Sequence, residues 1–177
     1  MTDVSLAAPL PVPAVFLDRD GVLNLDTGFP HLEEHLVFTP GAAEAVQQLN
    51  RYGYFVVIVT NQSGVARGLF SEAQMQAFNA LLVRRLAARG AVIGAVYACP
   101  FHDEATEPAY RHPDHPDRKP NPGMLLRAIA DHNLDAGRSF MIGDRQSDME
   151  AARRAGVQGF LFQGPNLNDF VSDLLGV

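Results

Sequence analysis

Five short apolar runs, each the length of a β-strand, recur along the 177-residue chain and constrain its fold more than any other feature. They span residues 14–17, 55–59, 95–98, 139–142 and 159–162. None alternates apolar with polar residues, as a strand with one wet face does, so both faces of each strand should be covered. Helical patterns lie between them at 40–52, 72–89, 123–131 and 148–155. This alternation predicts a doubly wound α/β fold, with a mainly parallel, Rossmann-like sheet and helices on both faces.

Local signals support several of these helix ends. Ser71 with Gln74, and Ser147 with Glu150, have the spacing of a capping box, in which two side chains satisfy free backbone N–H groups of the first turn. Gly156 stands where a left-handed residue would end a helix. These signals predict helices that begin just after Ser71 and Ser147.

Length and composition fit one domain over residues 1–177, with residues 1–12 as a flexible N-terminal segment. The net charge of −6 offers no basic surface for nucleic acid. Asp3 and several prolines interrupt the N-terminal apolar stretch, and no run approaches the roughly 20 residues that span a bilayer. The single cysteine excludes an internal disulfide. We therefore expect a cytoplasmic monomer that engages neither nucleic acid nor membrane.

Polar residues gather at the predicted carboxyl ends of the strands, where doubly wound sheets bind ligands. Asp18 and Asp20 follow the first apolar run, Thr60 the second and Asp144 the fourth, while Lys119 ends a long proline-rich loop. Each alone could be a turn former, a helix cap or a solvated charge. Together, carboxylates at one edge repel one another unless a cation neutralises them. Such oxygen ligands suit Mg²⁺, which leaves positions for water and substrate phosphate, so the pattern predicts phosphoryl transfer.

These motifs resemble those of the haloacid dehalogenase-like phosphatases over nearly the whole chain. The residues that carry the resemblance are D-R-D-G-V at 18–22, Thr60, Lys119 and G-D-x-x-x-D at 143–148. More narrowly, FLDRDGVLN, TNQSGVARG, RKPNPGML and IGD are similar to capless members that hydrolyse D-glycero-D-manno-heptose 1,7-bisphosphate. Framework helices and loops already use residues 24–53 and 64–118, so we expect an open site without a cap domain.

The resemblance implies a role for each residue of the predicted centre. Asp18 would attack phosphorus and form an aspartyl phosphate, which splits one slow hydrolysis into two easier steps. Asp20 would protonate the leaving sugar oxygen and then activate water, so we expect surroundings that favour its neutral form. Asp18, Asp144 and the backbone carbonyl of Asp20 would hold Mg²⁺. Thr60 and Lys119 would neutralise the transferring group.

The resemblance also implies substrate contacts, in loops that follow the strands. These residues are Asp26, Thr27, Gly28, Phe29, Asn61, Gln62, Ser63, Arg118 and Arg145. Arg118 and Arg145 suit the sugar or its second phosphate, because a guanidinium group can bind phosphate with two hydrogen bonds, although both could be plain surface charges. Asp148 has two interpretations: a support behind the metal ligands, or a carboxylate that favours a helix start.

Many members of the resembled family carry a structural zinc in the loop at 99–122, held by a Cys-x-His pair and a Cys-x-Cys pair. Here Cys99 matches, while His102, His115 and Asp117 are the residues that could replace the other three ligands. One thiolate with irregular spacing makes a poor structural zinc site. We therefore expect Mg²⁺ but not Zn²⁺, and a loop ordered by its prolines and aromatic residues.

Other functions fit the sequence less well. A dehalogenase needs no proton donor at the position of Asp20, because a leaving halide takes up no proton. The dehalogenating relatives lack a carboxylate there, so this function is disfavoured. A phospho-aspartate receiver domain would carry its Asp after the third strand, where Ala98 and Cys99 stand. A silent binding protein is disfavoured because no motif position is broken. We expect a phosphatase for a small phosphorylated sugar, namely the 7-phosphate of the heptose bisphosphate, with histidinol phosphate as the alternative substrate.

Overall fold

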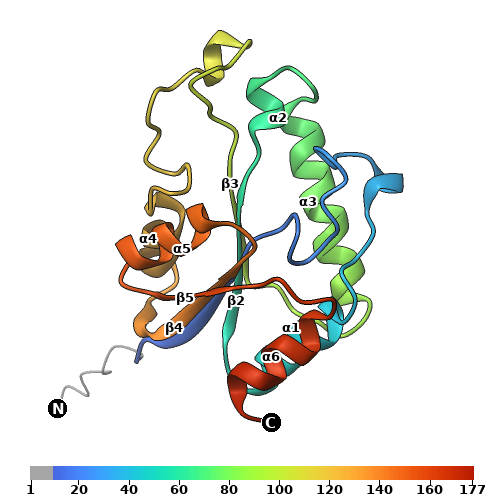
Figure 1. Ribbon diagram of the computed structural model, residues 1–177, viewed down its shortest axis with the longest axis vertical. Coiled ribbons are helices and arrows are strands. Elements are labelled where there is room, and N and C mark those ends of the chain that lie inside the picture. The colour runs from blue at the N-terminus through green and yellow to red at the C-terminus, as the bar shows by residue number, and fades with distance from the viewer. Residues whose placement is uncertain (1–9) are drawn as a thin grey trace, which may run out of the picture.

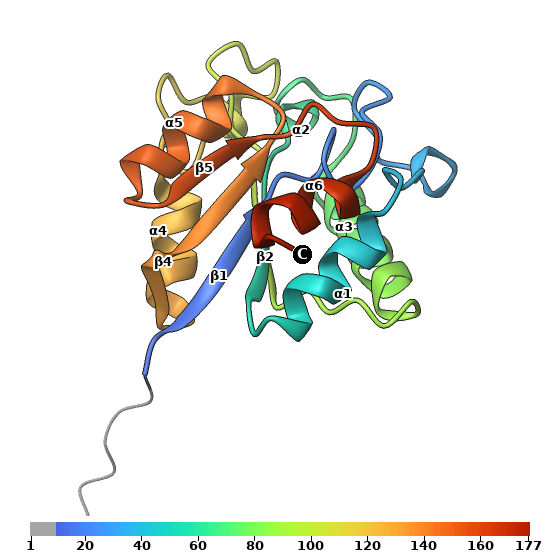
Figure 2. The same ribbon diagram turned by 60° about the horizontal axis from the view of Figure 1, so that its bottom comes forward.

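The computed structural model describes residues 10–177 and consists of a five-stranded sheet between two layers of helices (Figure 1, Figure 2). The strands are β1 (Val12–Leu17), β2 (Phe55–Asn61), β3 (Ala95–Cys99), β4 (Leu134–Gly143) and β5 (Gln158–Leu161). Their order is β3-β2-β1-β4-β5, and all neighbours are parallel. The chain reverses its winding beside β1, where such sheets bind ligands. The predicted doubly wound, Rossmann-like class is confirmed.

Six helices and two short 3₁₀ turns cover this sheet in the described residues. The helices are α1 (Ala42–Arg51), α2 (Ser63–Ala66), α3 (Glu72–Ala87), α4 (Gly123–Asp131), α5 (Gln146–Arg154) and α6 (Leu167–Leu175), and the turns are η1 (Glu33–His35) and η2 (Pro108–Tyr110). Helices α1, α3 and α6 contribute buried residues to one face, while α4 and α5 contribute them to the other. Within residues 10–177, the segments 24–53 and 64–118 form framework elements and loops, as expected for a capless protein.

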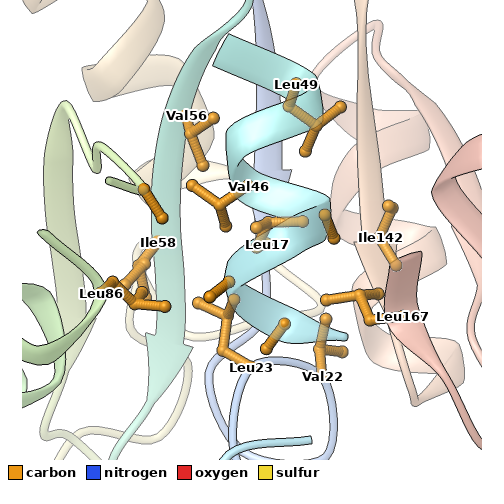
Figure 3. Close-up of a cluster of buried hydrophobic side chains, with 14 of the residues drawn as sticks. Leu17, Val22, Leu23, Val46, Leu49, Val56, Ile58, Leu86, Ile142 and Leu167 are labelled. Carbon is orange, nitrogen blue, oxygen red and sulfur yellow. The ribbon is translucent and has the colours of Figure 1, made fainter. Parts of the chain in front are cut away.

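The central strand β1 explains why the apolar runs lack polar alternation. Val15 and Leu17 pack against the layer of α1, α3 and α6, whereas Ala14 and Phe16 pack against the layer of α4 and α5. All four side chains are fully buried. Figure 3 shows the first of these clusters around Leu17. Because both faces of the strand are covered, apolar residues are required at every position.

Helix α5 begins earlier than its sequence pattern indicates. Its first residue is Gln146, and Asp148 accepts a hydrogen bond of 3.0 Å from the backbone N–H of Arg145, the N-cap residue. The predicted capping box of Ser147 with Glu150 is therefore wrong. The helix begins after Arg145, and the carboxylate of Asp148 accepts from the backbone N–H of that N-cap residue instead. The box of Ser71 with Gln74 is confirmed.

The N-terminal prediction is corrected in part. Val12 already belongs to β1 and pairs with Leu134 of β4, so the flexible N-terminal segment cannot extend to residue 12. Residues 1–9 lie outside the described part of the chain. Among residues 10–177, no helix has the length and apolar character needed to cross a membrane.

Candidate active site

A cavity of about 470 Å³ opens at the carboxyl end of the sheet, beside β1. It is lined by Asp18, Asp20, Asp26, Gly28, Phe29, Thr60, Asn61, Gln62, Ser63, Arg67, His102, Arg118, Lys119, Arg145, Ser147 and Asp148. All four predicted catalytic residues are in this set, as are all predicted substrate residues except Thr27. The topology thus brings together positions that the sequence separates by more than 100 residues.

Three carboxylates converge at the floor of the site. Asp18, Asp144 and Asp148 each offer an oxygen within 4.8 Å of the others, the one such acidic or metal-ligating group in the described chain. Burial raises the pKa of Asp18 to about 7, although Lys119 opposes the rise. Burial, and then the charge of Asp148, raise the pKa of Asp144. Asp144 Oδ1 is buried without a hydrogen-bond partner. Crowded acidic oxygens with an unsatisfied acceptor fit a hard divalent cation such as Mg²⁺.

Two glycines leave the room that these carboxylates occupy. A Cβ atom on Gly21 would overlap Asp144 Oδ2, and one on Gly143 would overlap the side chain of Asp148. Gly21 also has a φ of +86°, a left-handed conformation that favours glycine. The glycines that follow β1 and end β4 therefore serve the packing of the acidic cluster.

Lys119 places a buried ammonium group among the carboxylates. Its Nζ atom donates to Asp18 Oδ1 at 2.9 Å, and it lies 2.7 Å from Asp148 Oδ1. It also donates to the carbonyl oxygen of Val59 at 2.9 Å. Burial acts to lower the pKa of Lys119, but the two carboxylates together outweigh it and raise that pKa. Asn61 fixes the Lys119 backbone, since its amide bonds both the N–H and the carbonyl at 3.0 Å. Lys119 is therefore held in position and charged.

The Asp20 carboxylate receives four hydrogen bonds. Arg19 donates to both oxygens through Nε and Nη2, each at 2.9 Å. Asn24 Nδ2 donates to Oδ1 and Gln62 Nε2 donates to Oδ2, again at 2.9 Å. These four bonds hold the carboxylate through both of its oxygens, and two of them come from the guanidinium group of the adjacent residue.

Thr60 and Gln62 connect this carboxylate to the end of β2. Thr60 is buried, and its Oγ1 atom accepts a hydrogen bond of 2.9 Å from Gln62 Nε2, the group that also donates to Asp20. Gln62 is the N-cap residue of α2, which was not predicted. The turn from β2 into α2 therefore presents Thr60 and Gln62 to the cavity.

An ion pair crosses the mouth of the cavity. Asp26 accepts from the backbone N–H of Gly28 at 3.0 Å and from Arg145 Nη2 at 3.0 Å. Arg145 thereby joins the loop after β1 to the loop after β4. Gly28 and Phe29 both have positive φ, and the Phe29 ring is partly exposed beside the cavity. Thr27 does not line the cavity, although Asp26, Gly28 and Phe29 on either side of it do.

Positive charge lines the other side of the cavity. Arg118 Nη1 donates to the carbonyl of Phe101 at 3.3 Å, and Arg67 Nη2 lies 3.3 Å from His102 Nε2. Sequence reasoning did not assign Arg67 to the site, although it lies within the quoted TNQSGVARG stretch. It also assigned no role to Arg19, which stands between the two catalytic aspartates. Both arginines could have been found by asking where each charge of the motifs is neutralised.

The four candidate zinc ligands are not brought together. The metal-suited group in the described chain contains none of Cys99, His102, His115 and Asp117. Cys99 Sγ lies 3.9 Å from His115 Nδ1, and that nitrogen also accepts from the backbone N–H of Asp117 at 3.1 Å. The His115 ring stacks on Phe101 at 4.0 Å, and an arginine of α4 pairs with the Asp117 carboxylate. In the described chain these donor groups therefore do not form a single metal-binding cluster, and the absence of zinc stays a prediction.

Fold and site together define the class of protein. A parallel Rossmann-like sheet with a carboxylate cluster and a buried lysine at its central strand is that of a haloacid dehalogenase-like hydrolase. A family model described as HAD-hydrolase-like matches residues 117–164, the segment that carries Lys119, Asp144 and Asp148.

Known relatives narrow the class. The D-glycero-beta-D-manno-heptose-1,7-bisphosphate 7-phosphatase of Rhodopseudomonas palustris is 48% identical over 92% of this chain and 90% of its own. That of Mesorhizobium japonicum is 44% identical over 88% and 72%. The crystal structure of D,D-heptose 1,7-bisphosphate phosphatase from B. bronchiseptica, complexed with magnesium and phosphate, aligns with a TM-score of 0.75 at 32% identity. The alignment covers 92% of this chain and 87% of the B. bronchiseptica chain. The chain belongs to the D-glycero-beta-D-manno-heptose-1,7-bisphosphate 7-phosphatase family.

Proposed function

We propose that this protein is a Mg²⁺-dependent phosphatase that removes the 7-phosphate of D-glycero-D-manno-heptose 1,7-bisphosphate through an aspartyl-phosphate intermediate. The observation that carries the proposal is the placement of Asp18 at the end of β1, bonded to Lys119 and within a cluster of acidic oxygens. Relatives of high identity bear this activity in their names. One relative was crystallised with magnesium and phosphate.

The acidic cluster divides into metal ligands and a support. Asp18 and Asp144 would hold the ion, because Asp144 has an unsatisfied oxygen. Asp148 is occupied by Lys119 and by the backbone of Arg145, so it holds the lysine and caps α5. These contacts support both sequence interpretations of Asp148. When bound, Mg²⁺ supplies positive charge that offsets the carboxylates and the substrate phosphate.

The residues of the chain carry out two displacements. In the first, an oxygen of Asp18 forms a bond to phosphorus while the bond to the sugar oxygen breaks, and Asp20 gives that oxygen a proton. In the second, water attacks the same phosphorus, Asp20 takes up its proton and the bond to Asp18 breaks. Lys119 and Thr60 lie where they can offset charge on the transferring group. Asp20 ends the cycle in the protonation state in which it began.

The cavity is suited to a small, doubly phosphorylated sugar. Its lining includes three guanidinium groups, from Arg67, Arg118 and Arg145, in addition to Lys119. A guanidinium group binds phosphate by paired hydrogen bonds, so these arginines can bind a phosphate that is not cleaved. Asp26 and Gln62 offer partners for sugar hydroxyls.

Phosphate release with Mg²⁺ tests this proposal directly. The substrates are both anomers of heptose 1,7-bisphosphate, histidinol phosphate and fructose 1,6-bisphosphate. We expect kcat/KM to favour a heptose anomer by at least about 100-fold, or about 2.7 kcal/mol of transition-state discrimination. Because the relatives described above are named for the beta anomer, that anomer should be preferred. Preference for histidinol phosphate, or equal slow turnover of all substrates, would contradict the heptose assignment.

A further inference from the structure

Arg19 is the largest side chain that the structure buries completely. Nothing in the chemistry above uses it, although it stands between the nucleophile and the acid–base residue. Removing a guanidinium group from water is unfavourable unless its donors find partners. Its position therefore needs an explanation in terms of the contacts it makes.

Each nitrogen of this guanidinium group donates at least one hydrogen bond. Two parallel bonds of 2.9 Å reach the two oxygens of Asp20. Nη1 donates to Asn79 Oδ1 on α3 at 2.7 Å, and Nη2 donates to the carbonyl of Pro30 at 3.1 Å. The ring of Phe78 lies 4.7 Å below the guanidinium carbon. The planar group is thus fixed from several sides, and one of those sides is the Asp20 carboxylate.

The paired bonds determine how Asp20 can be oriented. A carboxylate has about four acceptor positions, and here all are filled, two of them by Arg19. Rotation of the carboxylate would break both of these bonds at once. Arg19 and Asn24 are fully buried, whereas Gln62 lines the cavity. The bond to Gln62 is therefore the one that a substrate can exchange, while the bonds to Arg19 persist.

The same side chain reaches the loop that closes one side of the cavity. Pro30, whose carbonyl accepts from Arg19, directly follows Phe29, and the loop through Gly28 and Phe29 lines the cavity. Arg19 therefore links the orientation of Asp20 to the position of a loop that would contact the sugar.

We propose that Arg19 is a positioning residue that aims the Asp20 carboxylate at the leaving-group oxygen and ties it to the Phe29–Pro30 loop. This inference rests on the proposed function, since proton donation by Asp20 is part of it. Positioned general acids contribute about 10²- to 10⁴-fold to rate, so misalignment of Asp20 should be costly.

Leaving groups of different basicity separate this role from a structural one. A sugar alkoxide needs a proton as it departs, whereas p-nitrophenolate departs without one. The ratio kcat/KM covers only the steps up to formation of the aspartyl phosphate, so the later water-activating role of Asp20 does not enter it. Loss of alignment should therefore lower kcat/KM for heptose bisphosphate far more than for p-nitrophenyl phosphate.

The test compares Arg19→Lys and Arg19→Gln with wild type on both substrates, with thermal unfolding measured in parallel. Lysine keeps the charge but cannot make two parallel bonds. Asn79→Ala is the matched control, because it removes another partner of Arg19 and leaves both bonds to Asp20. We expect the Arg19 variants to lose at least about 10²-fold on the sugar substrate. Their activity on p-nitrophenyl phosphate, and the ratio in the control, should change little.

Three results would overturn the inference. Equal losses on both substrates would mean that Arg19 only supports the fold. Failure of both Arg19 variants to fold would lead to the same conclusion. A wild-type enzyme that forms no aspartyl phosphate with either substrate would instead refute the proposed function on which the inference rests.

Discussion

Asp18 and Asp20 stand two residues apart, yet their side chains have different surroundings. Asp18 is bonded to Lys119, which is 101 positions away in the chain, while Asp20 is bonded to the adjacent Arg19 and to Gln62. The spacing of the two carboxylates could be read from the sequence. Their partners could not, because hydrogen bonds between distant loops depend on the packing of the whole sheet edge.

Replacing the two aspartates should give different defects. Asp18→Asn removes the nucleophile, and we expect turnover to fall by about 10⁴-fold or more. Asp20→Asn keeps the nucleophile, so slow phosphorylation should continue while the intermediate accumulates. Phosphate release and intact-protein mass spectrometry of acid-quenched samples measure both effects. Full activity in either variant would contradict the mechanism.

Burial of the acidic cluster should make stability depend on pH. The pKa of Asp18 rises from 3.8 to about 7 on folding without metal, and that of Asp144 also rises. The folded protein then binds protons more tightly than the unfolded chain, so its free energy of unfolding falls as pH rises from about 4 to about 7.

Mg²⁺ should oppose this loss of stability at higher pH, because it binds the ionised carboxylates. We expect the rise in Tm on adding Mg²⁺ to be larger at pH 7 than at pH 5, measured by thermal unfolding against an EDTA reference. An equal rise at both values would show that the acidic cluster is not the binding site.

Substitutions at Gly21 and Gly53 separate the cost of a left-handed backbone from the effect of a clash with Asp144. Gly21→Ala places a methyl group against Asp144, whereas Gly53→Ala meets no atom within 4 Å, and both glycines have φ above +80°. Each change should cost about 1–2 kcal/mol of stability from the left-handed backbone. Gly21→Ala alone should also raise the Mg²⁺ concentration needed for half-maximal activity. Equal Mg²⁺ requirements would contradict the assignment of Asp144.

At the scale of elements, the strands were predictable from their uninterrupted apolar runs. The main helices were predictable because their apolar residues recur with helical spacing over several turns. Helix α4 has the bounds that were predicted, whereas β4 begins at Leu134, ahead of the predicted run at 139–142. Asp135 and Arg138 obscure that start, since they pair with each other on an exposed part of the strand. Helix α6 was missed although Asn166 caps it.

The loop at 99–122 should remain ordered without zinc. Its His115 ring stacks on Phe101, and the hydroxyl of Tyr110 donates to Glu72 of α3 at 2.9 Å. Metal analysis of the purified protein should therefore find far less than one zinc per chain, and a zinc chelator should leave Tm unchanged. His115→Ala should lower Tm, because it removes the stacked ring. Stoichiometric zinc that resists dialysis would refute this expectation.

At the scale of the whole molecule, the convergence of the site followed from topology alone. Because all strands are parallel and β1 is central, their carboxyl ends meet at one edge, as predicted. The ion pair between Asp26 and Arg145 was not predictable, since each residue was expected to contact substrate. The sequence pattern specifies which loops meet but not which of their charges pair.

The prediction of a single-domain monomer is a matter for solution measurement. Exposed large apolar side chains are spread over different segments, as is usual for surface residues. Tyr52, Leu69 and Val92 lie in the segments that follow α1, α2 and α3, and Leu126 lies on α4. Light scattering at several protein concentrations should give the mass of one chain, 19.2 kDa. A concentration-independent doubled mass would contradict this prediction.

Lys119 belongs to the end of the long loop, yet its ammonium group lies at the floor of the cavity, bonded to Asp18 and Val59. Asn61 fastens its backbone to β2 at the same point. A chain whose loop has not yet docked therefore lacks the charge that offsets its acidic residues. We therefore expect the loop to dock and the catalytic centre to form together, so that local opening of the loop should abolish activity rather than reduce it in part.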